Sequence, residues 1–161
     1  MATRKIFKIN NPEELEVLRK ISKPVDKFDD RLNELIVDMI DTMKKADGAG
    51  LSAVQVGILK RLFIVATEKG IQEFINPEII EQSGECPILE EGCLSVPNRY
   101  GKVIRPNKVT VKAQDKTGKE FVATYTGFEA KAVAHENDHL NGRLYIDIEI
   151  KKDKKKKEKG K

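Results

Sequence analysis

Apolar residues recur at helical spacing over one long stretch of the chain. From Leu32 to Met43 they fill an i, i+3, i+4, i+7, i+8, i+11 pattern, which predicts a helix with one buried stripe. A shorter helix is expected before it, because Asn11 is a good N-cap and Pro12 suits the first helical position. That first helix should end near Ser22. The methionines of the long stripe are expected in the core and are assigned no function.

The pattern changes to that of β-strands from Arg61 onward. Short runs rich in apolar and β-branched residues alternate with turn residues. The expected strands are residues 62–67, 72–75, 102–105, 109–113 and 121–125, with a last strand at 144–148. Two helices, a run of antiparallel strands and one more helix predict an α+β fold. Residues 1–150 show no internal repeat and no linker, so they are expected to form a single domain.

The only two histidines of the chain lie four residues apart in the string HENDH, residues 135–139. In a helix, residues four apart lie on the same face, so both imidazoles would point into the same space. Thr126 and Glu129 have the spacing of a capping box, and Gly142 suits a left-handed helix end. Two imidazoles make half of a tetrahedral metal site, and Glu136 beside them need not be a ligand to act as an acid or base.

A chance occurrence of this string is the alternative, since short patterns give false positives and the histidines of such a helix can be ordinary polar residues. The expected cap, the expected stop and the absence of any other histidine favour the metal site. Phe128, Ala132, His135 and His139 fall on one helical stripe, so the metal-binding face would continue into an apolar one.

Composition excludes several classes of protein. The chain has 161 residues, of which 39% are hydrophobic and 35% charged, as in a globular domain. No apolar run approaches the length that spans a membrane, and residues 1–8 lack the apolar stretch of a secretory signal. A cytoplasmic location, without a membrane partner, is therefore expected.

The net charge of +4 is distributed unevenly. Residues 151–161 read KKDKKKKEKGK and carry a net charge of +6, whereas the preceding 150 residues carry −2. With no apolar residue to bury, this tail is expected to be disordered or at best a frayed helix.

A catalytic metal site usually needs a third protein ligand, and the two cysteines are candidates together with an acidic residue. Cys93 lies in residues 90–97, EEGCLSVP, which is expected to be an irregular segment facing a cleft. Cys86 precedes a proline and is interpreted as a small buried hydrophobe. A disulfide between the two is not expected in a reducing compartment.

A third segment, residues 48–57 (GAGLSAVQVG), is rich in small residues. It lacks the lysine and the spacing of a phosphate-binding loop. Its glycines would let the backbone approach a ligand closely, and Gln55 offers an amide donor. The alternative is an ordinary tight connection from a helix to a strand.

Together, these three segments resemble the signature motifs of the peptide deformylase family. The motifs are Gly48-x-Gly50-Leu51-Ser52-Ala53-x-Gln55, Glu91-Gly92-Cys93-Leu94-Ser95 and His135-Glu136-x-x-His139-Leu140-x-Gly142, in the order and at spacings similar to those of the family. The resemblance runs from about Arg19 to Ile148. It implies an α+β fold with antiparallel sheets packed around a central metal-binding helix, and an enzyme that removes the formyl group from the N-terminal formylmethionine of new bacterial or organellar proteins.

The resemblance also implies residue roles. Cys93, His135 and His139 would bind one divalent metal ion per chain, usually Fe²⁺ in the family, although the ligand set suits Zn²⁺ as readily and Ni²⁺ or Co²⁺ could substitute. Glu136 would carry the proton, and the Gln55 amide with the Leu94 backbone N–H would stabilise the negative charge on the formyl oxygen. Gly50 would contact the substrate backbone, and Phe128 and Ala132 would line the methionine pocket.

The chain departs from the usual family pattern at a few positions. Ser52 stands where Ala is more common, Ala134 where Gln is usual, and residues 98–101 are not the commonest form. None of these changes removes a ligand, a donor or the base. Family members commonly have a C-terminal helix that in some cases docks on the ribosome, and the lysine-rich tail is here hypothesised to contact ribosomal RNA instead. The enzyme itself is expected to be a monomer.

Two other functions are compatible with parts of the sequence. A zinc endopeptidase with HExxH would need a third histidine or a glutamate downstream, and it would leave Cys93 unexplained. A non-catalytic metal site in a ribosome-binding or RNA-binding module would have no use for Glu136 or Gln55.

Overall fold

Three α-helices and seven β-strands make up the computed structural model, which describes residues 2–86 and 89–150. The lysine-rich tail, predicted to be disordered, lies outside the described residues. In chain order the elements are α1 (Pro12–Leu18), α2 (Asp30–Lys45), β1 (Gly50–Ser52), the 3-10 helix η1 (Ala53–Val56), β2 (Leu62–Thr67), β3 (Gly70–Ser83), β4 (Leu89–Cys93), β5 (Val96–Val103), β6 (Lys108–Gln114), β7 (Glu120–Thr126), α3 (Gly127–Leu140) and the 3-10 helix η2 (Tyr145–Asp147). The predicted α+β class is confirmed.

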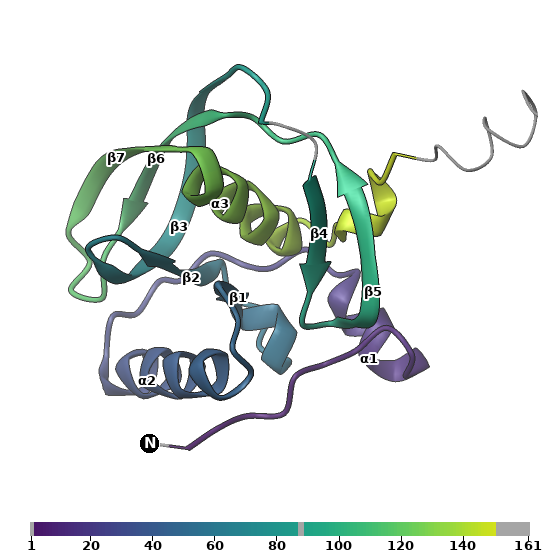
Figure 1. The fold of residues 1–161 in the computed structure, drawn as a ribbon. Coiled ribbons are helices and arrows are strands. Elements are labelled where there is room, and N and C mark those ends of the chain that lie inside the picture. The colour runs from purple at the N-terminus through teal and green to yellow at the C-terminus, as the bar shows by residue number, and fades with distance from the viewer. Residues whose placement is uncertain (1, 87–88, 151–161) are drawn as a thin grey trace, which may run out of the picture.

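The strands form two antiparallel sheets. A five-stranded sheet has the order β1-β2-β3-β6-β7, and β4 and β5 pair separately (Figure 1). The long strand β3 pairs first with β2 and then with β6, and its register shifts between Ile75 and Glu78. Asn76, at φ 51°, lies at this irregularity, where its side chain receives a hydrogen bond from the backbone N–H of Val25. Beyond that point β3 continues well past its predicted end.

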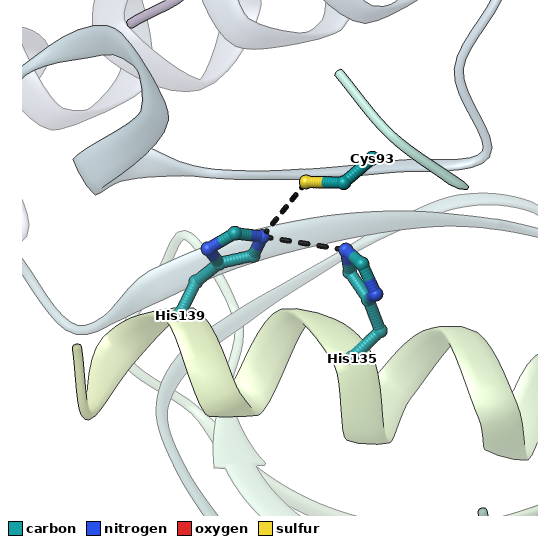
Figure 2. A group of neighbouring side chains, drawn as sticks. All are labelled: Cys93, His135 and His139. Carbon is teal, nitrogen blue, oxygen red and sulfur yellow. Dashed lines mark hydrogen bonds between the residues drawn. The ribbon is translucent and has the colours of Figure 1, made fainter. Parts of the chain in front are cut away.

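Helix α3 lies between the two sheets and is the central element of the fold (Figure 1). It packs on β1, β2, β6 and β7, and Figure 2 shows it close up with the side chains of His135 and His139 directed toward Cys93 at the end of β4. Gly142, at φ 73°, ends the helix as predicted. The predicted capping box is wrong, because the Thr126 side chain makes no capping hydrogen bond. Glu129 instead accepts a hydrogen bond from the backbone N–H of Glu68.

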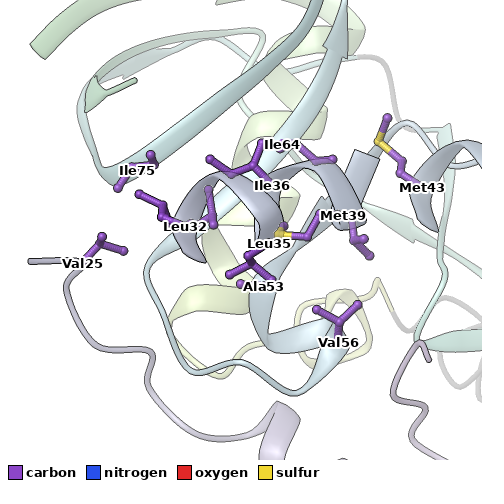
Figure 3. Packing of buried hydrophobic residues seen from close by; sticks show 12 residues of the cluster. Val25, Leu32, Leu35, Ile36, Met39, Met43, Ala53, Val56, Ile64 and Ile75 are labelled. Carbon is purple, nitrogen blue, oxygen red and sulfur yellow. The ribbon is translucent and has the colours of Figure 1, made fainter. Parts of the chain in front are cut away.

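The predicted stripe of α2 forms the first part of the core. Leu32, Leu35, Ile36, Met39 and Met43 pack against residues of β1, η1, β2 and β3 (Figure 3). A second cluster fills the space between α3 and the five-stranded sheet, around the stacked rings of Phe63 and Phe74. Burying a side chain of this size typically stabilises a fold by about 1.5–3 kcal/mol. The first cluster includes Leu51 of β1 and the second includes residues of α3, and α3 also packs directly on β1.

An extended N-terminal segment, residues 2–9, crosses the molecule below these layers (Figure 1). Arg4 pairs with the buried Asp38 on α2 at 2.9 Å. Farther along, the backbone N–H of Phe7 donates to the carbonyl of Gln55 at 2.7 Å, and that of Ile9 donates to the carbonyl of Ser95 at 3.0 Å. The segment thus bonds directly to η1, which follows β1, and to the turn that follows β4.

Four other predictions of local structure need correction. The strand expected at residues 102–105 is only the end of β5, which begins at Val96 and ends at Val103. The first helix is shorter than expected and ends at Leu18. The segment around Cys93, predicted to be irregular, is the end of strand β4, which the sequence analysis missed. The predicted strand at 144–148 is wrong: the chain forms η2 there, because Asp147 Oδ2 accepts a hydrogen bond from the Leu144 backbone N–H at 2.8 Å and closes a turn.

Candidate metal centre and its cleft

Helix α3 brings the two histidines together. His135 and His139 are both buried, and their Nε2 atoms lie 3.3 Å apart because one helical turn separates them on the same face. The rings meet edge to face with centroids 5.0 Å apart. The pair predicted from the HENDH string therefore presents two imidazole nitrogens to one point in space.

Cys93 lies at the same point and belongs to the two-stranded sheet of β4 and β5. It is the last residue of β4 and pairs with Val96, so only two residues turn the chain into β5. Gly92 allows this strand to pass Tyr100, since a Cβ on Gly92 would lie 2.7 Å from the tyrosine ring. The Sγ atom of Cys93 lies 3.3 Å from His139 Nε2 (Figure 2).

The three donor atoms fit a metal ion. The Sγ of Cys93 and one ring nitrogen of each histidine all lie within 4.8 Å of one another. Ligands held tetrahedrally at about 2.0–2.3 Å from an ion are roughly 3.3–3.6 Å apart, close to the two spacings of 3.3 Å measured here. A set of one thiolate and two imidazoles leaves a fourth position open, as in catalytic rather than structural sites. A metal-binding site at these three residues is therefore consistent with both the distances and the chemistry.

A buried network of charged side chains contacts His135 on the side of the ring that faces away from Cys93. Its Nδ1 atom lies 3.1 Å from Oε1 of Glu91, which leaves Nε2 as the atom that faces Cys93 and His139. Arg105 donates to Glu91 at 3.0 Å and to Asp138 at 2.7 Å, and its side chain is only 4% exposed. Burial raises the pKa of Glu91, but His135 and Arg105 outweigh burial and lower that pKa to about 2.

The two imidazoles have opposite tendencies to bind a proton. Burial lowers the pKa of His135, but its contacts with Cys93 and Glu91 outweigh burial and raise that pKa well above its usual range. Burial and the neighbouring His135 charge hold the pKa of His139 well below its usual range. The two rings therefore titrate as a coupled pair, and a metal ion must compete with protons for them. Within the described residues, Nδ1 of His139 is buried without a hydrogen-bond partner.

Glu136 lies beside the donor atoms without being one of them. It is buried, and its Oε2 atom lies 3.9 Å from His135 Nε2. Burial raises the pKa of its carboxyl group above the usual range. Gly50 leaves the space that this carboxylate occupies, since a Cβ at Gly50 would lie 2.8 Å from Oε2. A carboxylate with a raised pKa next to a metal site is suited to carrying a proton.

The Gln55 side chain is fixed at both ends of its amide. Its Oε1 atom accepts a hydrogen bond from the Ser52 backbone N–H at 2.9 Å. Its Nε2 atom donates to the Ser95 hydroxyl at 3.0 Å and lies 3.7 Å from Cys93 Sγ. These contacts assign the amide orientation, with the N–H₂ group turned toward the donor atoms.

A cleft of about 490 Å³ opens onto this centre. It is lined by the predicted residues Gly50, Gln55, Leu94, Phe128 and Ala132, together with Cys93, His135 and Glu136. Phe128 lies at the surface with 66% of its area exposed, whereas Ala132 is partly buried in the second core cluster. The structure therefore brings all the residues proposed from the sequence to one cleft, apart from His139, which lies beneath it as a buried donor.

Cys86 takes no part in this centre. It is buried, and its Sγ lies 3.4 Å from the carbonyl of Pro106 and 3.6 Å from that of Gly127. Its predicted role as a small buried side chain agrees with this position. Sequence reasoning missed Arg105 and Ser95, and it noted Ser52 only as an unusual residue. Arg105 and Asp138 come from distant parts of the chain, so spacing gave no signal for their ion pair.

Comparison with known proteins gives a consistent result. A family model described as polypeptide deformylase matches residues 3–156. A peptide deformylase of Caldicellulosiruptor bescii is 51% identical over 151 residues, which cover 94% of this chain and 88% of that protein. A peptide deformylase of Clostridium botulinum is 49% identical over 152 residues, covering 94% of this chain and all of that protein.

Solved structures agree with the sequence comparisons. The crystal structure of a peptide deformylase from Legionella pneumophila superposes with a TM-score of 0.86 at 42% identity, covering 99% of each chain. That of a peptide deformylase from Thermotoga maritima gives a TM-score of 0.87 at 41% identity, covering 93% of this chain and 99% of that chain. Likeness in sequence and fold thus extends over the whole described structure.

Proposed function

We propose residue roles for this chain, which belongs to the peptide deformylase family and is a metal-dependent hydrolase that removes the N-formyl group from nascent peptides. One observation carries these roles: Cys93, His135 and His139 place their donor atoms within 4.8 Å of one another, at the cleft that Cys93, His135 and Glu136 line. A formyl group is small, and the open side of this donor set would admit it.

Cys93, His135 and His139 would hold one divalent metal ion per chain. When bound, the ion would supply Lewis-acid chemistry, since such a cation lowers the pKa of a water molecule and polarises a carbonyl group. We propose Fe²⁺ as the native ion, following the family resemblance. The mixed thiolate and imidazole set also suits Zn²⁺, Ni²⁺ and Co²⁺.

Glu136 would carry the proton of the reaction. Its carboxylate would accept a proton from the attacking water and later return that proton to the leaving amine of the methionine. The position of Oε2, 3.9 Å from His135 Nε2, supports this role because it places the carboxylate next to the donor atoms but outside the set. Its raised pKa favours return of the proton near neutral pH.

Gln55 and Leu94 would stabilise the negative charge that develops on the formyl oxygen. The Gln55 amide is held with its N–H₂ group toward Cys93, and the backbone N–H of Leu94 follows Cys93 directly. Preorganised donors of this kind need no reorganisation as charge develops, and each is typically worth about 3 kcal/mol in the transition state.

The cleft beside these donors would bind the formylmethionyl end of a nascent peptide. Phe128 and Ala132 line its wall and would contact the methionine side chain. Gly50 exposes backbone at the edge of the cleft, and β1, to which it belongs, would hydrogen-bond the substrate main chain. The apolar wall supports methionine over charged first residues.

We also propose the domain organisation, oligomeric state and location of the protein, and a role for its tail. Residues 1–150 would act as one catalytic domain, as a monomer in the cytoplasm of a bacterium or in an organelle. Within the described residues, none of the helices has both the length and the apolarity needed to cross a bilayer. Residues 151–161 lie outside the described part of the chain. Their net charge of +6 supports attraction to ribosomal RNA.

The test is release of formate from formyl-Met-Ala-Ser by protein purified anaerobically, together with metal analysis of the same sample. We expect one metal ion per chain and stoichiometric formate, without cleavage of internal peptide bonds. Cleavage inside an unformylated peptide would favour the endopeptidase alternative. A fully metal-loaded protein that neither releases formate nor cuts peptides would favour a non-catalytic ribosome-associated role.

A further inference from the structure

The Glu136 carboxylate is held by a hydroxyl group from the neighbouring sheet. Within the part of the chain that the structure describes, Ser52 is the one side chain that donates a hydrogen bond to it, at 2.9 Å to Oε1. We propose that Ser52 is a positioning residue that fixes the orientation of the Glu136 carboxylate for proton transfer. This inference rests on the proposed role of Glu136 as the proton carrier.

The geometry assigns the two carboxylate oxygens different tasks. Oε1 is tied back to Ser52, whereas Oε2 points toward the donor atoms, 3.9 Å from His135 Nε2. The terminal torsion of a glutamate has a broad, roughly two-fold profile, so a carboxylate without a partner turns readily about it. A hydroxyl bound to one oxygen restrains that rotation and keeps the other oxygen facing the reaction.

Within the described residues, the Ser52 hydroxyl has two acceptors in reach, and both lie on Glu136. It lies 3.0 Å from the backbone carbonyl of Glu136 and 2.9 Å from Oε1, so both of its acceptors belong to the same residue. A serine carries one hydroxyl hydrogen, and an ionised carboxylate is the stronger acceptor of the two. Ser52 is also completely buried, so water does not compete for this hydrogen.

Strand β1 places Ser52 and Gly50 on the same side, because alternate residues of a strand share a face. Gly50 leaves room for Oε2, and Ser52 binds Oε1. The backbone N–H of Ser52 also fixes the amide of Gln55. A change of the Ser52 side chain keeps this backbone contact, so its effect on Glu136 can be measured separately from any effect on Gln55.

The experiment compares Ser52→Ala, Ser52→Cys and Ser52→Thr with wild type. Alanine removes the hydroxyl, cysteine keeps a similar volume with a weak donor, and threonine restores the hydroxyl. Loss of a charge-assisted hydrogen bond should lower kcat about tenfold in the alanine variant, with KM within about twofold. Cysteine should behave like alanine, threonine should recover most of kcat, and all three should bind one metal ion per chain.

A crystal structure of the Ser52→Ala protein gives a second readout that is independent of activity. We expect the Glu136 carboxylate to occupy more than one orientation there and a single orientation in wild type. Ser22→Ala is the matched control, because Ser22 is buried and its hydroxyl has no partner within the described residues. It should leave kcat and the Glu136 orientation unchanged. If Ser52→Ala does not fold, the cysteine and threonine variants answer the same question.

Two results would overturn the inference. One is an unchanged kcat in Ser52→Ala or Ser52→Cys with Glu136 in its wild-type orientation. The other is a loss of kcat that follows loss of metal and is not recovered by threonine. Failure of the underlying function looks different, because Glu136→Gln would then keep its turnover. If Glu136→Gln is inactive while Ser52→Ala is fully active, only the positioning role is wrong.

Discussion

The Nδ1 atom of His135 lies 3.1 Å from Oε1 of Glu91, so the ring nitrogen that faces away from Cys93 is held by a carboxylate. Such a contact fixes the tautomer and the direction of a metal-binding imidazole. Because His135 and Arg105 outweigh burial and lower the pKa of Glu91 to about 2, the carboxylate remains an ionised acceptor near neutral pH. Metal affinity should therefore depend on a residue that does not itself bind the metal.

Replacing Glu91 by alanine should weaken metal binding about 10–100-fold, because His135 loses the acceptor that orients it. Competition with a chromogenic chelator measures the affinity directly. Glu78→Ala, at an exposed carboxylate of β3, is the control and should bind metal like wild type. Equal affinity in the Glu91 variant and wild type would mean that the helix alone orients the imidazole.

Replacing Cys93 by alanine should abolish metal binding and turnover together, because it removes one of only three donor atoms. Cys86→Ala is a matched control, since Cys86 is the other cysteine and its Sγ contacts the carbonyls of Pro106 and Gly127. It should keep both properties. Metal analysis and formate release on the same samples make the comparison. Full metal content in the Cys93 variant would contradict the assignment.

Replacing Glu136 by glutamine should keep the metal and lose nearly all turnover, about 10²–10⁴-fold, because an amide fills the same volume but cannot carry the proton. Rates of formate release from metal-loaded protein give the effect. A variant that kept most of its rate would show that another group carries the proton.

The sequence predicted the centre better than its surroundings. The spacing of the HENDH string indicated His135 and His139, whereas Cys93 was one candidate among several and was assigned as the third ligand only through the resemblance to the peptide deformylase motifs. The network of Glu91, Arg105 and Asp138 could not be predicted, because ion pairing between distant segments depends on how the sheets pack. Hydrophobic periodicity predicted α2 correctly, since its stripe faces a continuous core.

The prediction of strands failed where the alternation of apolar and polar residues was weak or where a segment does not pair with a strand. Residues 89–93 read LEEGC, with too little apolar alternation to indicate β4, and their pairing with β5 depends on the turn at residues 94–95. Residues 144–148 do have apolar content. In the described part of the chain they join neither sheet but pack beside β4 and β5, with Tyr145 buried against Val96 and Val103. Local sequence cannot report a missing partner, so this segment was predicted as a strand.

Asp38 should make stability depend on pH in the acid range. The hydrogen bond from the Ala2 backbone N–H, aided by Arg4, outweighs burial and lowers the pKa of Asp38 below its usual value of 3.8. A lowered pKa adds stability above the unfolded value, and that stability disappears as the pH falls through the folded value. Asp38→Asn should therefore lower the free energy of unfolding by about 1 kcal/mol at neutral pH.

The difference between wild type and Asp38→Asn should shrink as the pH falls below 3.8. Urea unfolding at a series of pH values measures it. Asp41→Asn, on the same helix, is the control, because Asp41 makes no side-chain hydrogen bond or ion pair within the described residues. A difference that stayed constant down to the lowest pH would exclude a contribution from the Asp38 charge.

Deleting residues 151–161 should leave turnover of formyl-Met-Ala-Ser unchanged, because the tail follows the catalytic segments. If the tail contacts ribosomal RNA, the deletion should weaken co-sedimentation with ribosomes at low salt, and added salt should release the intact protein. A full-length variant with the tail lysines changed to glutamine controls for length. Identical ribosome binding by wild type, the deletion and the glutamine variant would show that the tail does not contribute to ribosome binding.

The hydrogen bonds of the N-terminal segment can form only after later parts of the chain have been synthesised. Residues 7 and 9 are made early, yet their hydrogen-bond partners on Gln55 and Ser95 are made much later. The 3-10 helix η1 and the turn after β4 therefore cannot receive this support until Gln55 and Ser95 have themselves been made, because contacts of long sequence separation form late. His135 and His139 are made later still, so an enzyme whose substrates are nascent chains completes its own active site only late in its own translation.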